Sequence, residues 1–434
     1  MSVQYYLMNK DKPLLSFICE RNEYEEPIFI EDKWLTDTRP LGFMGLSTFI
    51  ESRRAPKHRA HIAELLRQYG CDDLEGFLQA THALSLNDTL WVKSADSDLL
   101  WDDVSLYKNP FSEIISRTAF DGVSIGIDFP STSPEFGTEG AFAKCWKRVE
   151  AGQQIYLYKS GSTIYEIEPL SEYLAAQVSS ILCPSYVDYD LDRYHGRLIS
   201  TCKLFTDEKT GYISASRIFM RKQSISNMLD YFNALDSGDS FRRMCVLDAL
   251  IFNVDRHLGN FGILIDNDTF KPLRMAPVFD HNQSLFPSVD DDHIGNLTWY
   301  ASRSSPRFGT DLNVTAHALL TDSIRSDLKN LHGFEFAQHP QLKAPDQRLH
   351  YLSELVNKQI DNILDRTTVR FAAESGIFNF DRHEKGIVGY CKNHEDAQSK
   401  STETEIEKYR VVQDRLFMSD FDKYMLELEE NAKK

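Results

Sequence analysis

One short loop of this sequence carries an acidic residue and a side-chain amide five positions apart. The loop is NVDRHLGN, residues 253–260, and a second acidic residue ends the segment APVFD, residues 276–280. Phosphoryl transfer uses one carboxylate to orient the attacking hydroxyl, and an amide and a second carboxylate to hold Mg²⁺ against the phosphates. Asp255, Asn260 and Asp280 supply these three groups. The alternative is that Asp255 and Asn260 only cap turns, which Asp280 and the features upstream argue against.

The chain contains its own comparison for this motif. NFDRH, residues 379–383, repeats the first half of the loop, but Gly386 stands five residues after Asp381 where the first copy has Asn260. No apolar helix is expected before it and no acidic strand end after it. We interpret this second copy as a coincidence.

A glycine-containing turn precedes the strand expected over 141–148. Gly137 and Gly140 stand three apart, followed by Ala141 and Lys144. Glycine lets a backbone approach phosphates closely and present its N–H groups as donors. These residues are candidates for nucleotide binding, although an ordinary turn would give the same pattern.

A lysine ends the next expected strand, QIYLYK, and the following helix carries glutamates. Lys159 is the lysine, and Glu168 and Glu172 lie on the helix expected over 167–182. In kinases a strand lysine pairs with a helix glutamate while it contacts the nucleotide phosphates. Glu172 is the better pairing candidate. The alternatives are a solvated lysine and a glutamate favoured by the helix dipole.

These parts follow one another in the order found in protein-kinase-like folds. The order along the chain is a glycine turn, a strand lysine, a helix glutamate, a strand near 199–205, a buried helix, the D-x-x-x-x-N loop and a final Asp. The spelling differs from the usual one, because the loop reads D-R-H instead of H-R-D and no D-F-G occurs. His281 and Asn282 follow Asp280 instead.

At these motifs the chain resembles the HipA-like serine/threonine kinases of bacteria. The similar segments are GAFAKCW, IYLYK, NVDRHLGNFGIL and MAPVFDH, and the resemblance covers about residues 130–370. Phosphatidylinositol kinases share the D-R-H-x-x-N element, so that element alone does not separate the two groups. The resemblance implies an α+β, bilobal protein-kinase-like fold, with a small mixed N-lobe and a mainly helical C-lobe.

The resemblance also implies roles for individual residues. Asp255 would be the catalytic base, and Asn260 and Asp280 would be the Mg²⁺ ligands. Lys159 would contact the ATP phosphates, which Gly140 and its neighbours would cover. Adenine would lie against the strand that ends near Phe205, a position inferred from the order along the chain. His257 is expected to hold the loop.

The resemblance implies an ATP- and Mg²⁺-dependent transfer to Ser or Thr of a protein, in a toxin or a regulator. Members of the family can phosphorylate themselves near the glycine loop, which makes Ser131, Ser133 and Thr138 candidate acceptors. An antitoxin-type protein partner is also implied. Two alternatives stay open, a catalytically silent nucleotide-binding regulatory protein and a small-molecule or lipid kinase.

The elements that must position these residues fall into four expected segments. Residues 1–95 form a mixed α/β module, 96–206 the N-lobe, 207–370 a helical C-lobe, and 371–434 a helical extension with a polar linker. Short apolar segments at 5–8 and 14–18 flank a turn-like sequence, and the pattern predicts strands at 89–92 and 154–159. Helices are expected at 59–69, 241–253 and 405–428, with further helices within 312–366 and a hairpin-like pair of apolar runs over 262–278.

Composition excludes several classes of protein. The 434 residues include 48 Lys and Arg against 65 Asp and Glu, a net charge of −17, which argues against direct nucleic-acid binding. The sequence contains no apolar run of about 18 residues, so no membrane span is expected. No signal peptide is expected either. The seven cysteines are scattered without CxxC spacing, which favours a reducing cytoplasm over a disulfide framework or a zinc site.

Overall fold

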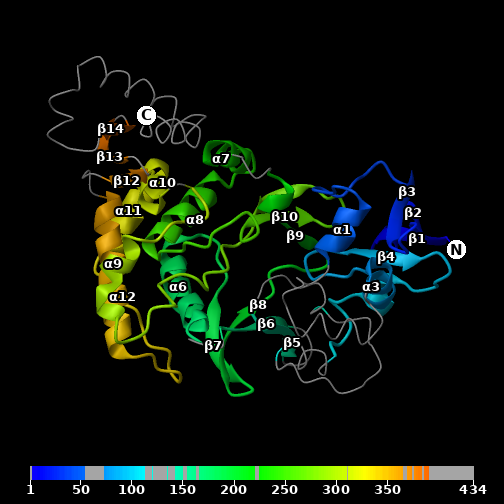
Figure 1. The fold of residues 1–434 in the computed structure, drawn as a ribbon, viewed down its shortest axis with the longest axis horizontal. Coiled ribbons are helices and arrows are strands. Elements are labelled where there is room, and N and C mark those ends of the chain that lie inside the picture. The colour runs from blue at the N-terminus through cyan, green and yellow to red at the C-terminus, as the bar shows by residue number, and fades with distance from the viewer. Residues whose placement is uncertain are drawn as a thin grey trace, which may run out of the picture. The chain divides into compact units, whose positions relative to one another are not determined.

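The computed structural model describes most of the chain as antiparallel sheets and helices, so the predicted mixed α and β character is confirmed (Figure 1). The residues described are 2–53, 73–112, 120, 134, 142–149, 154–162, 166–219, 224–309, 311–364, 369–373, 376–383 and 386–390. They pack into two compact units. The first contains Met1–Pro169, Val187–Ile218 and Gly262–Leu273, and the second contains Leu170–Tyr186, Phe219–Phe261 and Arg274–Lys434.

The N-terminal part of the first unit is a four-stranded antiparallel sheet in the order β3-β2-β1-β4. Its two central strands carry buried residues, such as Tyr5, Leu7 and Phe17, and in β2 residues 14–17 are all buried. This confirms the strand predicted at 89–92 and shows that the apolar segments at 5–8 and 14–18 are strands, whereas the helix predicted at 59–69 lies outside the described residues. The elements are β1 (Val3–Asn9), β2 (Lys12–Arg21), β3 (Pro27–Trp34), α1 (Leu46–Ser52), α3 (Leu74–Thr81), β4 (Leu90–Ser94) and α4 (Trp101–Val104).

Two further sheets complete the first unit. One has the order β5-β6-β8-β7 and the other β11-β10-β9, where the division between the units falls within β11. The strands predicted at 154–159 and 199–205 and the hairpin over 262–278 are confirmed. The strands are β5 (Lys144–Val149), β6 (Gln154–Ser160), β7 (Tyr189–Tyr194), β8 (Arg197–Lys203), β9 (Thr210–Ser214), β10 (Gly262–Asp266) and β11 (Pro272–Met275).

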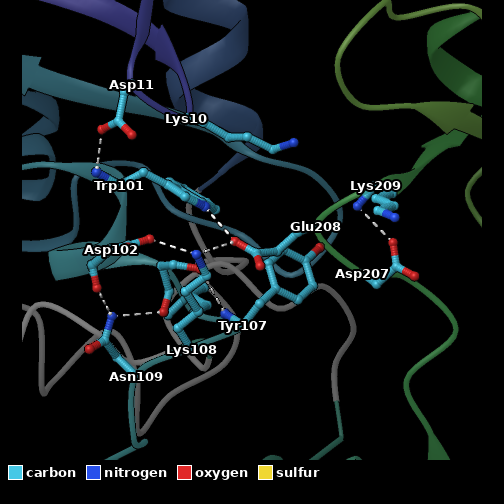
Figure 2. Close-up of polar contacts among 12 residues, drawn as sticks. Lys10, Asp11, Trp101, Asp102, Tyr107, Lys108, Asn109, Asp207, Glu208 and Lys209 are labelled. Carbon is cyan, nitrogen blue, oxygen red and sulfur yellow. Dashed lines mark hydrogen bonds and ion pairs between the residues drawn. The ribbon is translucent and has the colours of Figure 1, made fainter.

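The N-terminal module is hydrogen-bonded to the segment that follows β8. The Leu86 carbonyl accepts from the Tyr107 hydroxyl at 2.8 Å and from the Thr206 hydroxyl at 2.6 Å. Figure 2 shows the neighbouring contact, in which the Trp101 Nε1–H donates to Glu208 at 2.6 Å. The segment around Thr206 and Glu208, next to the predicted adenine position, is therefore fixed by residues from the start of the chain.

The second unit is mainly helical and surrounds a buried central helix, α8. Ten of its residues are buried, which confirms the apolar helix predicted at 241–253. Three rings from other segments, Phe232, Phe261 and Phe308, pack on Phe241. The helices are α6 (Glu168–Leu182), which begins two residues before the unit does, α7 (Ile225–Ala234), α8 (Gly238–Leu250), α9 (Leu297–Ala301), α10 (Leu312–Leu319), α11 (Asp322–Leu331) and α12 (Asp346–Leu364).

The helical extension predicted from residue 371 begins instead with strands. Between residues 369 and 390 the chain forms three antiparallel strands, β12 (Val369–Ala373), β13 (Gly376–His383) and β14 (Gly386–Tyr390). β13 contains the second copy of the D-R-H sequence, so in this copy the motif lies on a strand and not in a loop. The alternation of apolar residues in GIFNF suits a strand. The linker predicted at 391–404 and the helix predicted at 405–428 lie outside the described residues.

Two expectations from composition concern the described part of the chain. None of its helices combines the length and apolar character that crossing a membrane requires. Its five cysteines, Cys19, Cys145, Cys183, Cys202 and Cys245, are buried thiols.

Candidate active site

A buried ion pair joins the end of α8 to the loop predicted to be catalytic. Arg256 donates through Nε and Nη2 to the two carboxylate oxygens of Asp248, at 2.9 Å each. Asn253 donates to the same carboxylate at 3.0 Å. Asp248 and Arg256 are both almost fully buried. The loop therefore begins from a fixed point, because a paired and hydrogen-bonded buried charge leaves little freedom for movement.

The same guanidinium joins the two segments that carry the predicted metal ligands. Arg256 Nη1 donates to the Asn260 carbonyl at 2.7 Å and to the Phe279 carbonyl at 2.8 Å. Phe279 directly precedes Asp280. The structure thus brings Asn260 and Asp280 together by their backbones, with one nitrogen bound to both segments.

The charge states of this pair follow from burial and pairing. Burial raises the pKa of Asp248, and the charge and hydrogen bonds of Arg256 oppose that effect. Burial acts to lower the pKa of Arg256, but the Asp248 carboxylate offsets it and the net shift is upward, with a further contribution from the charge of Asp280. We take the pair as ionised, since a guanidinium stays protonated in proteins.

Asp255 lies at the more open end of the loop. Its side chain is 31% exposed, and Arg307 Nη1 lies 2.6 Å from its Oδ1. A hydrogen bond across the loop joins its two ends, because the Asn260 side-chain amide donates to the Asp255 carbonyl at 3.3 Å. His257 Nδ1 accepts from the Gly259 N–H at 3.0 Å, so His257 holds the loop as expected. A carboxylate on a braced loop is suited to accept a proton from a bound hydroxyl.

Asn260 and Asp280 supply oxygen donors that fit Mg²⁺. The Asn260 nitrogen makes the bond to Asp255, so the amide oxygen is the atom suited to a cation. Asp280 adopts a left-handed backbone, φ 60°, which Asp and Asn tolerate better than most residues. Among the described residues no group of three or more His, Cys, Asp or Glu is arranged to hold a metal. Mg²⁺ needs only one or two protein carboxylates when phosphates and waters complete its shell.

Lys144 and Lys159 lie in the first unit, opposite each other in the register of β5 and β6. Both side chains are buried, with Lys159 7% exposed, so the alternative of a solvated strand-end lysine does not hold. Phe205 lies beyond the end of β8 and packs edge-on against Tyr212, with ring centroids 5.7 Å apart. The placement of adenine near Phe205 stays a prediction.

Glu172 lies in the second unit and is fully buried on α6. The helix begins at Glu168, which places Glu172 beyond the first turn and weakens the helix-dipole alternative. Gly137, Gly140 and Ala141, and the candidate acceptors Ser131, Ser133 and Thr138, lie outside the described residues.

Sequence reasoning missed three residues of this site. Asp248 had a signal, since it is an acidic residue within the apolar run MCVLDALIF, and buried acids are paired. Arg256 was noted as part of the D-R-H motif, but the sequence assigned it no role. Arg307 stands 52 residues after Asp255, and nothing in the sequence pattern connects the two.

Comparison with known proteins finds a curated relative and solved structures, of which two are described below. No protein-family model matches the chain. The serine/threonine-protein kinase CtkA of Helicobacter pylori strain J99 is 29% identical over 136 residues, which are 28% of this chain and 42% of CtkA. The aligned part therefore spans less than half of that relative.

The two structures are more distant. The crystal structure of a Helicobacter pylori proinflammatory kinase CtkA aligns with 51% of this chain and 92% of its own, at 20% identity and a TM-score of 0.38. HipA of Shewanella oneidensis MR-1, in a complex with HipB and operator DNA, aligns with 83% of this chain and 97% of its own, at 10% identity and a TM-score of 0.46. The sequence relationship to a serine/threonine-protein kinase confirms the resemblance to the HipA-like kinases that the motifs predict.

Proposed function

We propose that this chain is an ATP- and Mg²⁺-dependent kinase of the HipA-like type that phosphorylates Ser or Thr of a protein, itself included. One observation carries the proposal: the Arg256 guanidinium binds the Asn260 and Phe279 carbonyls and so joins the catalytic loop to the Asp280 segment. The sequence relationship to a serine/threonine-protein kinase supports the same activity. The bilobal, protein-kinase-like arrangement of the chain is part of this proposal.

The proposed reaction works mainly by positioning and charge neutralisation. Asp255 orients the acceptor hydroxyl and takes its proton. Asn260 and Asp280 would hold Mg²⁺, which supplies neutralisation of phosphate charge when bound. Lys159 would bind the ATP phosphates with Glu172 as its partner, Lys144 and the glycine segment at Gly137, Gly140 and Ala141 would cover them, and adenine would lie near Phe205.

A protein partner of the antitoxin type is proposed from the resemblance to HipA-like kinases. The net charge of −17 offers no general surface for phosphate backbones. A link to DNA would therefore come through the partner and not through direct contact by this chain. A role as a toxin or a regulator is proposed on the same basis.

The test is the intact mass of the protein after incubation with Mg-ATP, measured for wild type and for Asp255→Asn. The proposal expects phosphate-sized gains in the wild type alone. ADP formation with a mixed library of Ser- and Thr-containing peptides extends the test to foreign acceptors. Equal activity of the two proteins, or no ADP formation and no mass gain in the wild type, contradicts the proposal.

A further inference from the structure

An arginine outside every predicted motif is fixed next to the candidate catalytic base. The segment from Ser302 to Gly309 follows α9, and the Arg307 backbone N–H donates to the Val254 carbonyl at 2.9 Å. The next residue, Phe308, packs its ring against Phe261 at 5.4 Å between centroids. The Cα of Arg307 is therefore tied on one side by a backbone hydrogen bond and on the other by a core aromatic ring.

The residue after this ring completes the anchor. Gly309 has φ +75°, and a Cβ at this position would lie 2.7 Å from the Thr315 hydroxyl oxygen. A larger residue would be strained both by its backbone conformation and by this contact. The backbone conformation directly after Phe308 is thus restricted to one that suits glycine, which limits how far the Arg307 backbone can move from the loop.

The side chain of Arg307 reaches the base itself. Its Nη1 lies 2.6 Å from Asp255 Oδ1, and the Arg307 side chain is 65% exposed. Exposed ion pairs contribute little to stability, so a structural role does not account for a cation held at this point. The pair leaves Asp255 accessible and places a positive charge beside the oxygen that is expected to receive the acceptor hydroxyl.

Phosphoryl transfer creates negative charge that the Arg307 guanidinium could stabilise. In transfer to Ser or Thr, a bond forms between the hydroxyl oxygen and the γ-phosphorus, the bond from that phosphorus to the leaving ADP oxygen breaks, and the hydroxyl proton goes to Asp255. Negative charge on the equatorial phosphoryl oxygens needs a partner. A guanidinium has five N–H donors in a planar fork, and in the described residues Asp255 receives one of those of Arg307.

We propose that Arg307 contacts the phosphoryl group in transit and stabilises its charge while it holds Asp255 in place, so that the chain supplies its own arginine finger. This inference rests on the proposed kinase activity. A guard that only blocks Asp255 would use the same contact but would have the opposite effect on rate.

The test compares wild type with Arg307→Ala and Arg307→Lys. Arg303→Ala is the matched control, because Arg303 lies on the same segment and stacks on the exposed Trp299 ring at 4.1 Å. The readouts are the rate of ADP formation with the peptide library, phosphate incorporation by intact mass, and the affinity for a non-hydrolysable Mg-ATP analogue.

We expect Arg307→Ala to lower the rate by about 100-fold or more, with analogue affinity within about threefold of wild type. Arg307→Lys should fall between the two, because lysine keeps the charge but not the fork. Added guanidinium, well below denaturing concentration, should restore part of the rate of Arg307→Ala, which a structural defect would not allow. Arg303→Ala should match the wild type.

Two results would overturn the inference. An active wild type with an unchanged or faster Arg307→Ala would show that Arg307 does not assist transfer, and a faster variant would identify a guard. A wild type that neither forms ADP nor gains phosphate would contradict the proposed function itself, and the inference would fall with it.

Discussion

Arg256 binds both carboxylate oxygens of Asp248, eight residues earlier on the last turn of α8, through Nε and Nη2 at 2.9 Å each. This pair holds the guanidinium in place, and its third nitrogen, Nη1, donates to the Asn260 and Phe279 carbonyls. The pair therefore positions the segments that carry Asn260 and Asp280. A planar guanidinium can serve three partners at once, whereas an ammonium cannot reproduce the fork.

Arg256→Met should therefore destabilise the protein by about 3–5 kcal/mol, because it leaves the Asp248 carboxylate buried without its cation. Urea unfolding measures the effect. The double variant Arg256→Met with Asp248→Leu should recover part of the loss, since no unpaired charge remains. Arg21→Met, which removes exposed ion pairs with Asp73 and Glu75, is the control and should stay close to wild type, because exposed pairs contribute little. A small effect of Arg256→Met would show that the pair does not organise the site.

Asp255→Asn should reduce transfer by about 10²- to 10⁴-fold, the usual contribution of a positioned general base. Asn keeps the size of the side chain, so affinity for a Mg-ATP analogue should stay near that of the wild type. Asp381→Asn in the second D-R-H sequence is the sequence-matched control. It should keep full activity, and a comparable loss there would mean that the wrong copy has been assigned.

Asp280→Asn should weaken nucleotide binding only when Mg²⁺ is present. Asparagine tolerates the left-handed backbone at this position as well as aspartate does, so the substitution removes charge with little backbone strain. Titration of a fluorescent ATP analogue with and without Mg²⁺ separates the two conditions. Asp290→Asn, at an exposed acid paired with His293, is the control. Identical Mg-ATP affinity in wild type and Asp280→Asn would exclude the metal role.

The buried thiols should resist alkylation in the folded protein. Burial raises the pKa of Cys183 to about 12 and that of Cys19 to about 11, and the thiolate is the reactive form. At pH 8 both should react slowly with iodoacetamide, and both should react fully in urea. Peptide mapping by mass spectrometry gives the rate at each site. Rapid modification of Cys183 under native conditions would contradict its placement in the core.

Local elements were predictable where a residue's surroundings are set by its near neighbours. The buried helix α8 was expected from its apolar pattern, and the hairpin of β10 and β11 from two apolar runs separated by a turn. The segments of β1 and β2 were recognised as apolar but not assigned to strands. The segment TGYIS of β9 contains no run of more than two apolar residues, and β13 was missed although GIFNF alternates. Short strands are defined by their partners, and the pairing of β9 with β10 joins residues about 50 positions apart.

In the candidate site, too, the residues whose role could be predicted are those whose partners lie nearby in the sequence. The chemistry of Asp255, Asn260 and Asp280 could be read from residue types and spacing, because a loop of eight residues contains two of them. The role of Arg256 could not, since its partners lie eight residues before it and 23 after it. Arg307 reaches Asp255 across 52 residues, and only the folded chain brings that pair together.

The discontinuous first unit has a consequence for biosynthesis. The Asn9 side chain donates to the Asn267 carbonyl at 2.7 Å and accepts from Thr89 at 2.6 Å, so this buried network closes a loop of 258 residues. On the ribosome the first strand must wait until more than half of the polypeptide has emerged before its last partner exists. Sequence-distant contacts of this kind slow folding and prolong the exposure of unpaired strand edges. We therefore expect the nascent chain to depend on chaperones until β10 has left the exit tunnel.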